Sequence, residues 1–513
     1  MGQAAGSKSS LSTAIALIGI TAFVSLMISH YYLVNGDDLL EIWGDKASGL
    51  GTLLHTQRTF PLEIDPLLYH LLTFVEISLW GLKPVLLRLP SLFGFLLMQL
   101  CLFVFVRRIA SSRTALAALL FPALSATFTY TLYIRPYGFL LGLFALASLS
   151  WQTAVRYERH RIYWLISLAL TIALAINTHY YAVLLLVPLC FAELVRSWQN
   201  RRLDFPMLSA LFAGTMGTFF ILPFLKGASE FRNNYVKEGV SYHTVLQSYN
   251  SILLGPATYS IFANHLLAIA LLLCAAFVFR SCIVQIRTGQ IAMPLPEFVF
   301  LLTLAGLPVF AFLIGHFVTH AMEPRYALGA IVGISVLSAI SISPSLRLPK
   351  LGAGILLILV AAFTWRSFQQ VRAAKTSRDM QLASMVLAPA IKAAIMNTPS
   401  QLLYVQDVDA FGFAQFHESD RNVLSHMALV YSATEEMKWN HTETGTRIVT
   451  HLKRVETYNI TSYEHSTARP GRYIFLINQG GWNWIEDALA ARHARVTPIG
   501  TALGLKVVSV EFD

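Results

Sequence analysis

Two adjacent carboxylates are the first residues in the chain whose types and spacing could do chemistry. Asp37 and Asp38 directly follow a long apolar run, in the segment Asn-Gly-Asp-Asp. Neighbouring carboxylates at a membrane boundary repel each other and are costly to desolvate. One of them could act as a general base, with help from a divalent cation such as Mg²⁺ or Mn²⁺. The alternative is a solvated helix start, because Asp is favoured at helix N-termini.

A second and a third cluster hold further acidic, basic and aromatic residues. Glu63, Asp65 and Tyr69 surround a proline that suits the first turn of a helix. The two carboxylates alone would be typical of a solvated loop. Arg135 and Tyr137 lie in a very short hairpin between two apolar runs. An arginine placed there either reaches toward lipid headgroups or binds a phosphate, and both readings stay open.

Two later clusters contain histidine and tyrosine. His179 and Tyr180 lie in the turn Asn-Thr-His-Tyr-Tyr, although a histidine among tyrosines is also typical of the aromatic belt at a membrane interface. Arg325 and Tyr326 lie in a turn that also holds two histidines four residues apart. Because those histidines have no paired acid, we predict no metal site there.

The composition sets the kind of scaffold that must position these residues. Hydrophobic residues make up 55% of the 513, charged residues only 13%, and the mean hydropathy is +0.57. These values exclude a soluble enzyme, a disordered chain and a coiled coil. Residues 372–513 are neutral, so the net charge of +10 belongs to residues 1–371. Positive charge confined to the apolar part is an orientation signal and not a nucleic-acid footprint.

About eleven apolar runs are long enough to cross a bilayer as helices. They lie near residues 11–34, 86–106, 114–133, 138–155, 162–177, 179–195, 206–225, 262–280, 297–318, 326–343 and 351–367. Arginine-rich loops alternate with loops of balanced charge, which predicts a cytoplasmic N-terminus by the positive-inside rule. All the clusters named above then face the same, outer side of the membrane.

These spans divide the chain into two predicted domains. Residues 1–367 form an all-α polytopic membrane domain, with surface helices in a first outer loop at 35–84 and a second large outer loop at 226–260. Residues 368–513 form a small outer α/β domain. Its expected strands are Leu402–Val405, Tyr473–Ile477 and Leu505–Val510, and its expected helix is Trp484–Arg495.

The order of the motifs resembles a known group of enzymes. An acidic pair follows the first span, then come Pro-Leu-x-Tyr, Arg-Leu-Pro-Ser, Arg-Pro-Tyr, Thr-His-Tyr-Tyr and a late Pro-Arg-Tyr. Over about residues 11–345 this series resembles the polytopic GT-C fold glycosyltransferases, in particular bacterial members of glycosyltransferase family 39 and the related aminoarabinose transferases. Such enzymes move a sugar from a polyprenyl-phosphate carrier to an acceptor hydroxyl or phosphate group at the outer face.

The resemblance implies a role for each matching residue. Asp37 or Asp38 would be the catalytic base, Glu63 and Asp65 would line the acceptor side, and Arg135 and Arg325 would bind the lipid phosphate. The other substrate-binding candidates carried over are Tyr69, Tyr137, His179, Tyr180 and Tyr326. Some relatives have a second acidic residue where this chain has Tyr137. Its absence here argues against a metal site that combines a hairpin carboxylate with the acidic pair. The expected cofactor is a single cation at Asp37/Asp38.

The resemblance also implies partners and a location. The partners would be a polyprenyl-phosphate sugar donor, membrane lipid, and a glycolipid, glycan or protein acceptor. The location would be a bacterial inner membrane with the C-terminal domain in the periplasm, or the ER membrane in a eukaryote. The rival hypothesis is a secondary transporter or flippase for a lipid or sugar. A transporter should place ionisable residues near mid-membrane, often in two related halves, whereas here they cluster at the outer boundary.

Overall fold

The computed structural model describes residues 2–34, 37–59, 65–226, 240–255, 261–385, 393, 403–405, 427–431, 458–459, 471–477, 493–502 and 505–512. The chain divides into two compact units. The first comprises Met1–His30, Asp65–Pro223 and Val236–Arg372, and the second comprises Tyr31–Ile64, Phe224–Tyr235 and Ala373–Asp513.

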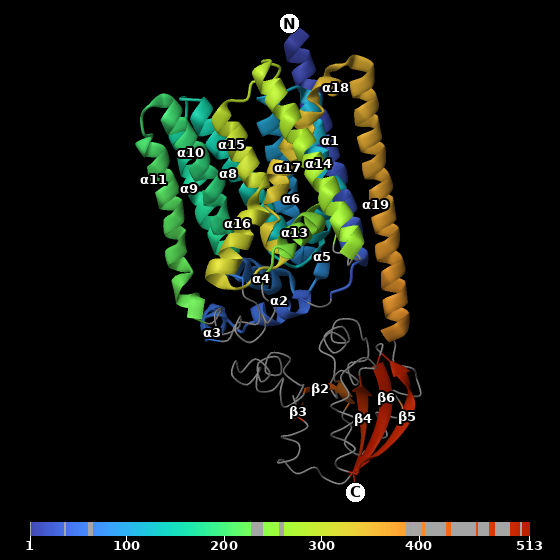
Figure 1. The fold of residues 1–513 in the computed structure, drawn as a ribbon. Coiled ribbons are helices and arrows are strands. Elements are labelled where there is room, and N and C mark those ends of the chain that lie inside the picture. Colours follow the sequence, from blue (N-terminus) through green and yellow to red (C-terminus); the bar gives the residue numbers. More distant parts are fainter. Residues whose placement is uncertain are drawn as a thin grey trace. The chain divides into compact units, whose positions relative to one another are not determined.

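The first unit is a bundle of helices (Figure 1). Its α-helices are α1 (Gly2–Tyr31), α4 (Leu67–Trp80), α5 (Pro84–Leu87), α6 (Leu89–Arg107), α7 (Ser112–Leu124), α8 (Tyr137–Arg156), α9 (Arg161–Thr178), α10 (Leu186–Asn200), α11 (Phe205–Thr215), α13 (His243–Leu253), α14 (Ile261–Arg287), α15 (Leu295–Ala305), α16 (Leu307–Ile314), α17 (Ala330–Ser341), α18 (Ser343–Arg347) and the start of α19 (Pro349–Met385). Short 3₁₀ or π turns extend several of them: η1 (Ala126–Leu132), η2 (Tyr180–Leu185), η3 (Met216–Phe220), η4 (Leu222–Phe224), η5 (Gly315–Thr319) and η6 (Pro324–Ala327).

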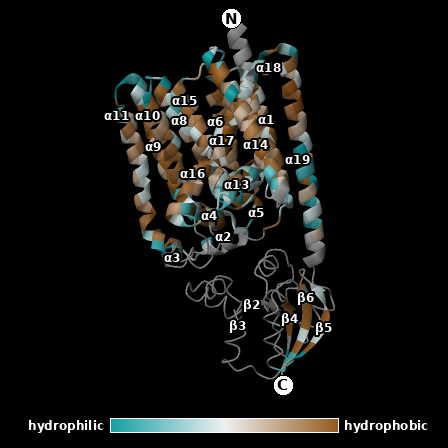
Figure 2. Ribbon diagram, viewed as in Figure 1, coloured by the Kyte–Doolittle hydropathy of each residue, from teal (hydrophilic) through white to brown (hydrophobic). Residues whose placement is uncertain are grey.

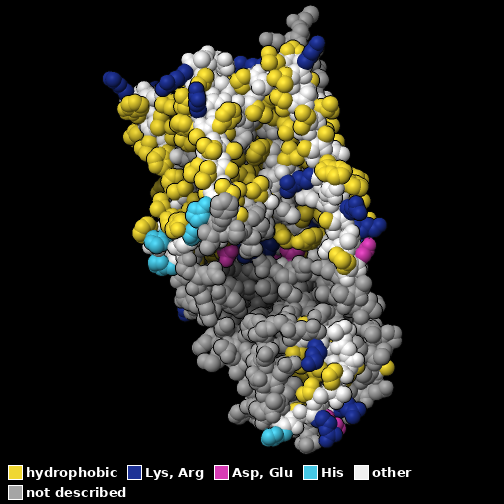
Figure 3. All heavy atoms as spheres, turned by 45° about the vertical axis from the view of Figure 1, so that its right-hand side comes forward, with side chains coloured by type: hydrophobic (Ala, Val, Ile, Leu, Met, Phe, Trp, Pro, Cys, Tyr) yellow, Lys and Arg dark blue, Asp and Glu magenta, His cyan; other side chains and the backbone are white. Residues whose placement is uncertain are grey.

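The bundle is built to lie in a membrane. Apolar residues run along the helices and cover the face of the bundle, while Lys and Arg side chains gather along one end (Figures 2 and 3). Eight described helices are long and apolar enough to span a bilayer, and up to ten if each of two bent pairs is one span. The chain is therefore a multi-pass membrane protein. The count of eleven stays a prediction, because α17, in the run expected at 326–343, has 12 residues.

Both bent spans have side chains that satisfy the carbonyls freed at the bend. The α7–η1 pair bends by 64°. There Arg366 donates to the carbonyl oxygens of Leu124 and Ser125, at 2.5 and 2.9 Å. The second pair begins with α15 and bends by 56°. Tyr249 donates its hydroxyl to the carbonyl of Ala305 at 3.0 Å. Because unpaired carbonyls in an apolar medium cost several kcal/mol each, these contacts stabilise the bends.

Close backbone contact fixes α6 against α8. A Cβ placed on Gly94 would lie 2.3 Å from the carbonyl oxygen of Gly138, and one on Gly142 would lie 2.5 Å from that of Gly94. The Gly138 N–H donates to Ser91 Oγ at 3.1 Å. Since Gly138 follows the Arg135–Tyr137 hairpin directly, the contact holds that hairpin in one position on α6.

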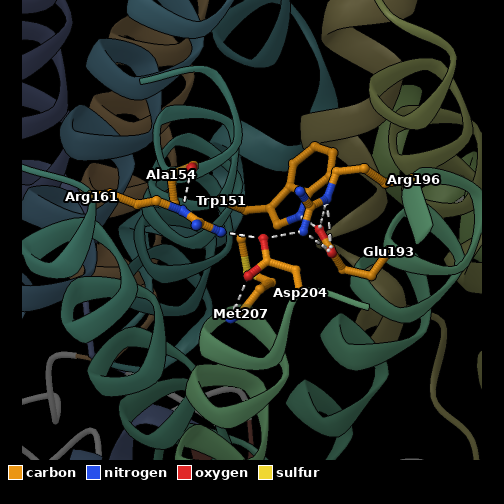
Figure 4. A network of polar contacts seen from close by, with 7 residues as sticks. All are labelled: Trp151, Ala154, Arg161, Glu193, Arg196, Asp204 and Met207. Atoms are coloured by element: carbon orange, nitrogen blue, oxygen red, sulfur yellow. Dashed lines mark hydrogen bonds and ion pairs between the residues drawn. The ribbon is translucent and has the colours of Figure 1, made fainter. Parts of the chain in front are cut away.

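One end of the bundle carries a closed network of ion pairs (Figure 4). Arg196 pairs with Glu193 at 2.6 Å and also with Asp204, and Arg161 pairs with Asp204. Trp151 donates its indole N–H to Glu193 at 2.7 Å. We call Arg161, Glu193, Arg196 and Asp204 the arginine-end network. It joins α9, α10 and the start of α11, and its two arginines pair with two carboxylates.

The second unit contains two short helices and a β-sheet. Its helices are α2 (Asp37–Asp45) and α3 (Leu50–Thr59), and its strands are β1 (Leu403–Val405), β2 (Met427–Tyr431), β3 (Tyr458–Asn459), β4 (Gly471–Ile477), β5 (Arg495–Ala502) and β6 (Leu505–Phe512). The strand order is β3-β2-β1-β4-β6-β5. The first four strands in that order are parallel, and β4, β6 and β5 pair antiparallel.

The predicted fold class, a polytopic helical part followed by a small C-terminal part with strands, is confirmed. β1, β4 and β6 coincide with the three expected strands. Most of the expected helix Trp484–Arg495, up to residue 492, lies outside the described residues. The prediction that Arg495 ends this helix is wrong, because Arg495 begins β5 and pairs with Glu511 of β6. The predicted domain boundary at 367/368 falls within α19 and stays a prediction.

Candidate anion-binding site

The hairpin arginine is buried and faces an acidic residue. Its neighbour Pro136 caps the start of α8, which leaves Arg135 in the short link between η1 and that helix. The Arg135 side chain is 6% exposed and its guanidinium lies 3.5 Å from Asp65 Oδ2. Asp65 is 8% exposed and comes just before α4. The contact joins two clusters that are 70 residues apart in the sequence.

A second arginine approaches the same place. The guanidinium carbons of Arg135 and Arg325 each lie 5.9 Å from the centre of the Tyr137 ring. Tyr137 is buried and is also in edge contact with Tyr130 at 5.7 Å. An aromatic ring within reach of two guanidiniums offsets part of their mutual repulsion, because the ring face attracts cations. Tyr137 therefore helps to keep two like charges close together.

His179 completes the cluster as a neutral group. Its Nδ1 accepts the backbone N–H of Tyr181 at 3.2 Å, and its Nε2 lies 3.9 Å from Asp65 Oδ1. Burial lowers the pKa of His179 to about 4; Arg135 and Arg325 lower it further, and Asp65 opposes them. The imidazole is therefore uncharged at neutral pH, with Nδ1 as acceptor and the proton on Nε2.

Aromatic contacts tie this turn to the loop that carries Arg325. The His179 and Tyr326 rings are 5.1 Å apart and the Tyr181 and Tyr326 rings 4.7 Å. The Tyr181 hydroxyl also contacts Thr319 Oγ1 at 2.7 Å and donates to the carbonyl of Ala321. The sequence drew attention to His179 and Tyr180 but missed this role of Tyr181, although it stands in the same Thr-His-Tyr-Tyr motif.

The cluster brings two guanidiniums to one aromatic ring. Arg135 also pairs with the buried carboxylate of Asp65, while His179 is neutral and Glu323 is exposed. Two guanidiniums this close to each other favour phosphate or carboxylate oxygens, so the arrangement suits an anion. We call Asp65, Arg135, Tyr137, His179, Arg325 and Tyr326 the hairpin-end cluster.

The remaining predicted residues of the first unit have less defined places. Tyr69 is fully buried on α4, one turn after Asp65, and Tyr180 is half-buried at the start of η2. Glu63 lies outside the described residues. The structure thus brings six of the predicted residues together, and their roles in binding substrate stay predictions.

The acidic pair begins α2 in the second unit. Asp37 is the first residue of the helix, and its side chain lies outside the described part. Asp38 is buried, as are Glu41 and Asp45, which follow it by three and seven residues. Residues at this spacing share one face of a helix. No role was predicted for Glu41 and Asp45, although the spacing of the three acids is visible in the sequence.

The Arg-Leu-Pro-Ser motif has a structural role here. Arg88 is almost wholly buried and donates to the carbonyl of Ser29 at 3.1 Å, which ties α6 to α1. Ser91 accepts from Gly138, as described above. The motif thus positions the hairpin from outside the hairpin-end cluster.

The fold is that of the GT-C glycosyltransferases, as the resemblance implied. Residues 65–225 match the family model described as dolichyl-phosphate-mannose-protein mannosyltransferase, a match that includes Asp65, Arg135 and His179. A search of curated proteins finds no relative of this chain.

Solved structures support the same fold. ArnT from Cupriavidus metallidurans, bound to undecaprenyl phosphate, is similar with a TM-score of 0.58 and 13% identity, over 97% of each chain. The apo state of ArnT from the same organism gives a TM-score of 0.58 and 13% identity over 98% of each chain. At this identity the likeness shows the fold alone. The family model and these structural neighbours are those of glycosyltransferases.

Proposed function

We propose that this protein transfers a sugar from a polyprenyl-phosphate carrier to an acceptor at the outer, periplasmic or lumenal face of its membrane. The observation that carries the proposal is the convergence of Arg135 and Arg325 on the Tyr137 ring in the hairpin-end cluster. The phosphate of the carrier would bind there between Arg135 and Arg325. The GT-C fold supports the proposal, because a protein that shares it has been seen with undecaprenyl phosphate bound.

Orientation follows from the distribution of charge. The arginine-end network and the hairpin-end cluster lie at opposite ends of α8 and α9. We place the arginine-rich end in the cytoplasm, by the positive-inside rule. The hairpin-end cluster then lies at the outer surface, where a lipid-linked sugar would be used.

The reaction needs a base as well as a phosphate site. We assign the base to Asp38, since it is buried, whereas the Asp37 side chain is not described. The carboxylate would take the proton of the acceptor hydroxyl as its oxygen bonds to the anomeric carbon. The bond from that carbon to the phosphate oxygen breaks, and the carrier leaves as an anion. Arg135 and Arg325 would stabilise the growing charge on this leaving group. Attack from the side opposite the phosphate inverts the anomeric centre.

A divalent cation fits the acids of α2. Glu41 and Asp45, one turn apart on the helix, offer hard oxygen ligands within 4.8 Å of each other, which suits Mg²⁺ or Mn²⁺. This assignment moves the expected metal from the pair Asp37/Asp38 to Glu41 and Asp45. When bound, the cation would act as a Lewis acid.

The test is a transfer assay in lipid nanodiscs, with undecaprenyl-phosphate sugars as donors and a hydroxyl-bearing glycolipid as acceptor. We expect Asp38→Asn to abolish transfer with the fold intact, and Asp37→Asn to retain it. Asp379→Asn, a neutralised acid in α19, is the matched control. Full activity of Asp38→Asn would overturn the assignment of the base to Asp38. Vectorial movement of lipid across the bilayer without sugar transfer would instead favour a transporter.

A further inference from the structure

Helix α4 is polar on its buried face and apolar on its exposed face. Its buried residues are Tyr69, His70, Thr73 and Glu76. Its exposed large apolar residues are Val75, Leu79 and Trp80. An apolar outer face suits contact with lipid, as Figure 2 shows for the bundle as a whole. Polar side chains on the buried face of a helix call for an explanation of their own.

Two side chains of that inner face each hold an oxygen that no described residue pairs with. Thr73 is 1% exposed and Glu76 is 7% exposed. Within the described part of the chain, neither Thr73 Oγ1 nor Glu76 Oε2 has a hydrogen-bond partner. Leaving a buried polar atom unpaired costs about 1–3 kcal/mol. Buried polar atoms in native proteins are almost always paired, so two such atoms within one helical turn mark a place where a ligand could supply the partner.

The state of Glu76 narrows the kind of partner. Burial raises its pKa to about 8, with no charged group contributing. α4 packs against α9 and α5. The titratable residues of α9, Arg161 and Tyr163, lie at its far end, and α5 has none. At neutral pH the group is therefore a carboxylic acid, which both donates and accepts hydrogen bonds. That chemistry matches hydroxyl groups.

The position of the two residues points to a sugar. α4 starts beside Asp65 of the hairpin-end cluster, and Thr73 and Glu76 lie two and three turns further along it. At 1.5 Å per residue they are about 4.5 Å apart along the axis. We propose that Thr73 and Glu76 form a subsite for the hydroxyl groups of the transferred sugar, about 12 and 16 Å along α4 from Asp65 of the hairpin-end cluster. The inference rests on the proposed function and adds a sugar-reading element to it.

The experiment compares two kinds of lipid ligand on the full chain in nanodiscs. The probes are undecaprenyl phosphate alone and the same lipid carrying mannose, glucose or 4-aminoarabinose, with affinity measured by native mass spectrometry. The wild type is expected to bind at least one sugar-bearing lipid about tenfold more tightly than the bare lipid phosphate. Glu76→Leu should abolish this difference and leave the affinity for undecaprenyl phosphate unchanged. Thr73→Val should reduce the difference about threefold.

Two further variants separate binding from a structural role. Glu76→Gln should keep the preference for the sugar-bearing lipid, because the amide also donates and accepts. Val75→Ala, on the exposed face of the same helix, should change neither affinity. The melting temperature of Glu76→Leu should rise, since an unpaired buried carboxyl is replaced by an apolar group; a residue needed only for the fold would lower it.

The outcomes distinguish this inference from the proposed function. A Glu76→Leu variant that keeps the preference, or that loses affinity for both lipids equally, overturns the sugar subsite and leaves the phosphate site standing. Equal wild-type affinity for the bare lipid and for all three sugar-bearing lipids overturns it as well. A wild type that binds no lipid phosphate at all overturns the proposed function and the subsite together.

Discussion

The two charged regions of the bundle differ in what surrounds their arginines. In the arginine-end network, two arginines meet two carboxylates, and the indole of Trp151 adds a further hydrogen bond. In the hairpin-end cluster, the guanidiniums of Arg135 and Arg325 converge on the Tyr137 ring, Asp65 lies 3.5 Å from Arg135, and the nearby histidine is neutral. The first arrangement holds helices together, whereas the second suits an anion.

The largest expected effect concerns the arginine-end network and tests its structural role. Arg196→Met removes the cation that pairs with Glu193 and one of the two cations that pair with Asp204. Breaking a buried ion pair costs about 3–5 kcal/mol, so we expect a loss of about 3 kcal/mol in unfolding free energy. Arg202→Met, in the exposed turn after α10, is the control and should change stability by less than about 0.5 kcal/mol. Denaturant unfolding in detergent measures both, and equal losses would mean that the network is not structural.

The binding role of the hairpin-end cluster is tested by Arg325→Gln, because Arg325 is half-buried, whereas Arg135 pairs with the buried Asp65. Loss of a charge-assisted hydrogen bond to phosphate costs about 2 kcal/mol, or about 30-fold in affinity for the lipid donor. We expect the donor KM to rise by that factor while the melting temperature falls less than in Arg196→Met. A melting temperature that falls as far as in Arg196→Met would show that the two regions do not differ in kind.

A smaller effect concerns pH. The folded-state pKa of His179, about 4, lies below its ordinary value of 6.5. The unfolded chain therefore binds a proton that the folded chain does not between these two values. Stability should fall as the pH drops from 6.5 toward 4, by at most about 1.4 kcal/mol per pH unit from this residue. His179→Asn keeps an acceptor for the Tyr181 N–H, and its stability should depend less on pH over that range. If the stability of His179→Asn depended on pH as strongly as that of the wild type, another group would be the one that binds the proton.

The smallest expected effect sharpens the link between the two loops of the cluster. Tyr181→Phe removes the hydroxyl that contacts Thr319 and Ala321. The loss should be about 1 kcal/mol in stability, with a modest rise in donor KM, because Arg325 follows this loop directly. Tyr163→Phe, an exposed tyrosine of α9, is the control. If both variants behaved alike, the contact would not help to position Arg325.

Much of this organisation could be predicted from the sequence. Apolar runs gave the spans, and charge bias placed the motifs of Asp65, Arg135, His179 and Arg325 on one side, where the structure brings them together. Hydropathy reports on single helices, so it could not show which helices touch. The carboxylate partners of Arg161 and Arg196, the burial of the α2 acids and the buried acid of α4 all depend on helix rotation and packing.

The backbone contact between α6 and α8 has a consequence for engineering. Donor specificity could be altered by grafting segments from a relative, and the hairpin with α8 is the obvious piece to exchange. Because Gly94, Gly138 and Gly142 interlock so closely that a single methyl group does not fit, a graft of α8 alone will shift the hairpin arginine. A working chimera must exchange α6 and α8 together, as one inherited module.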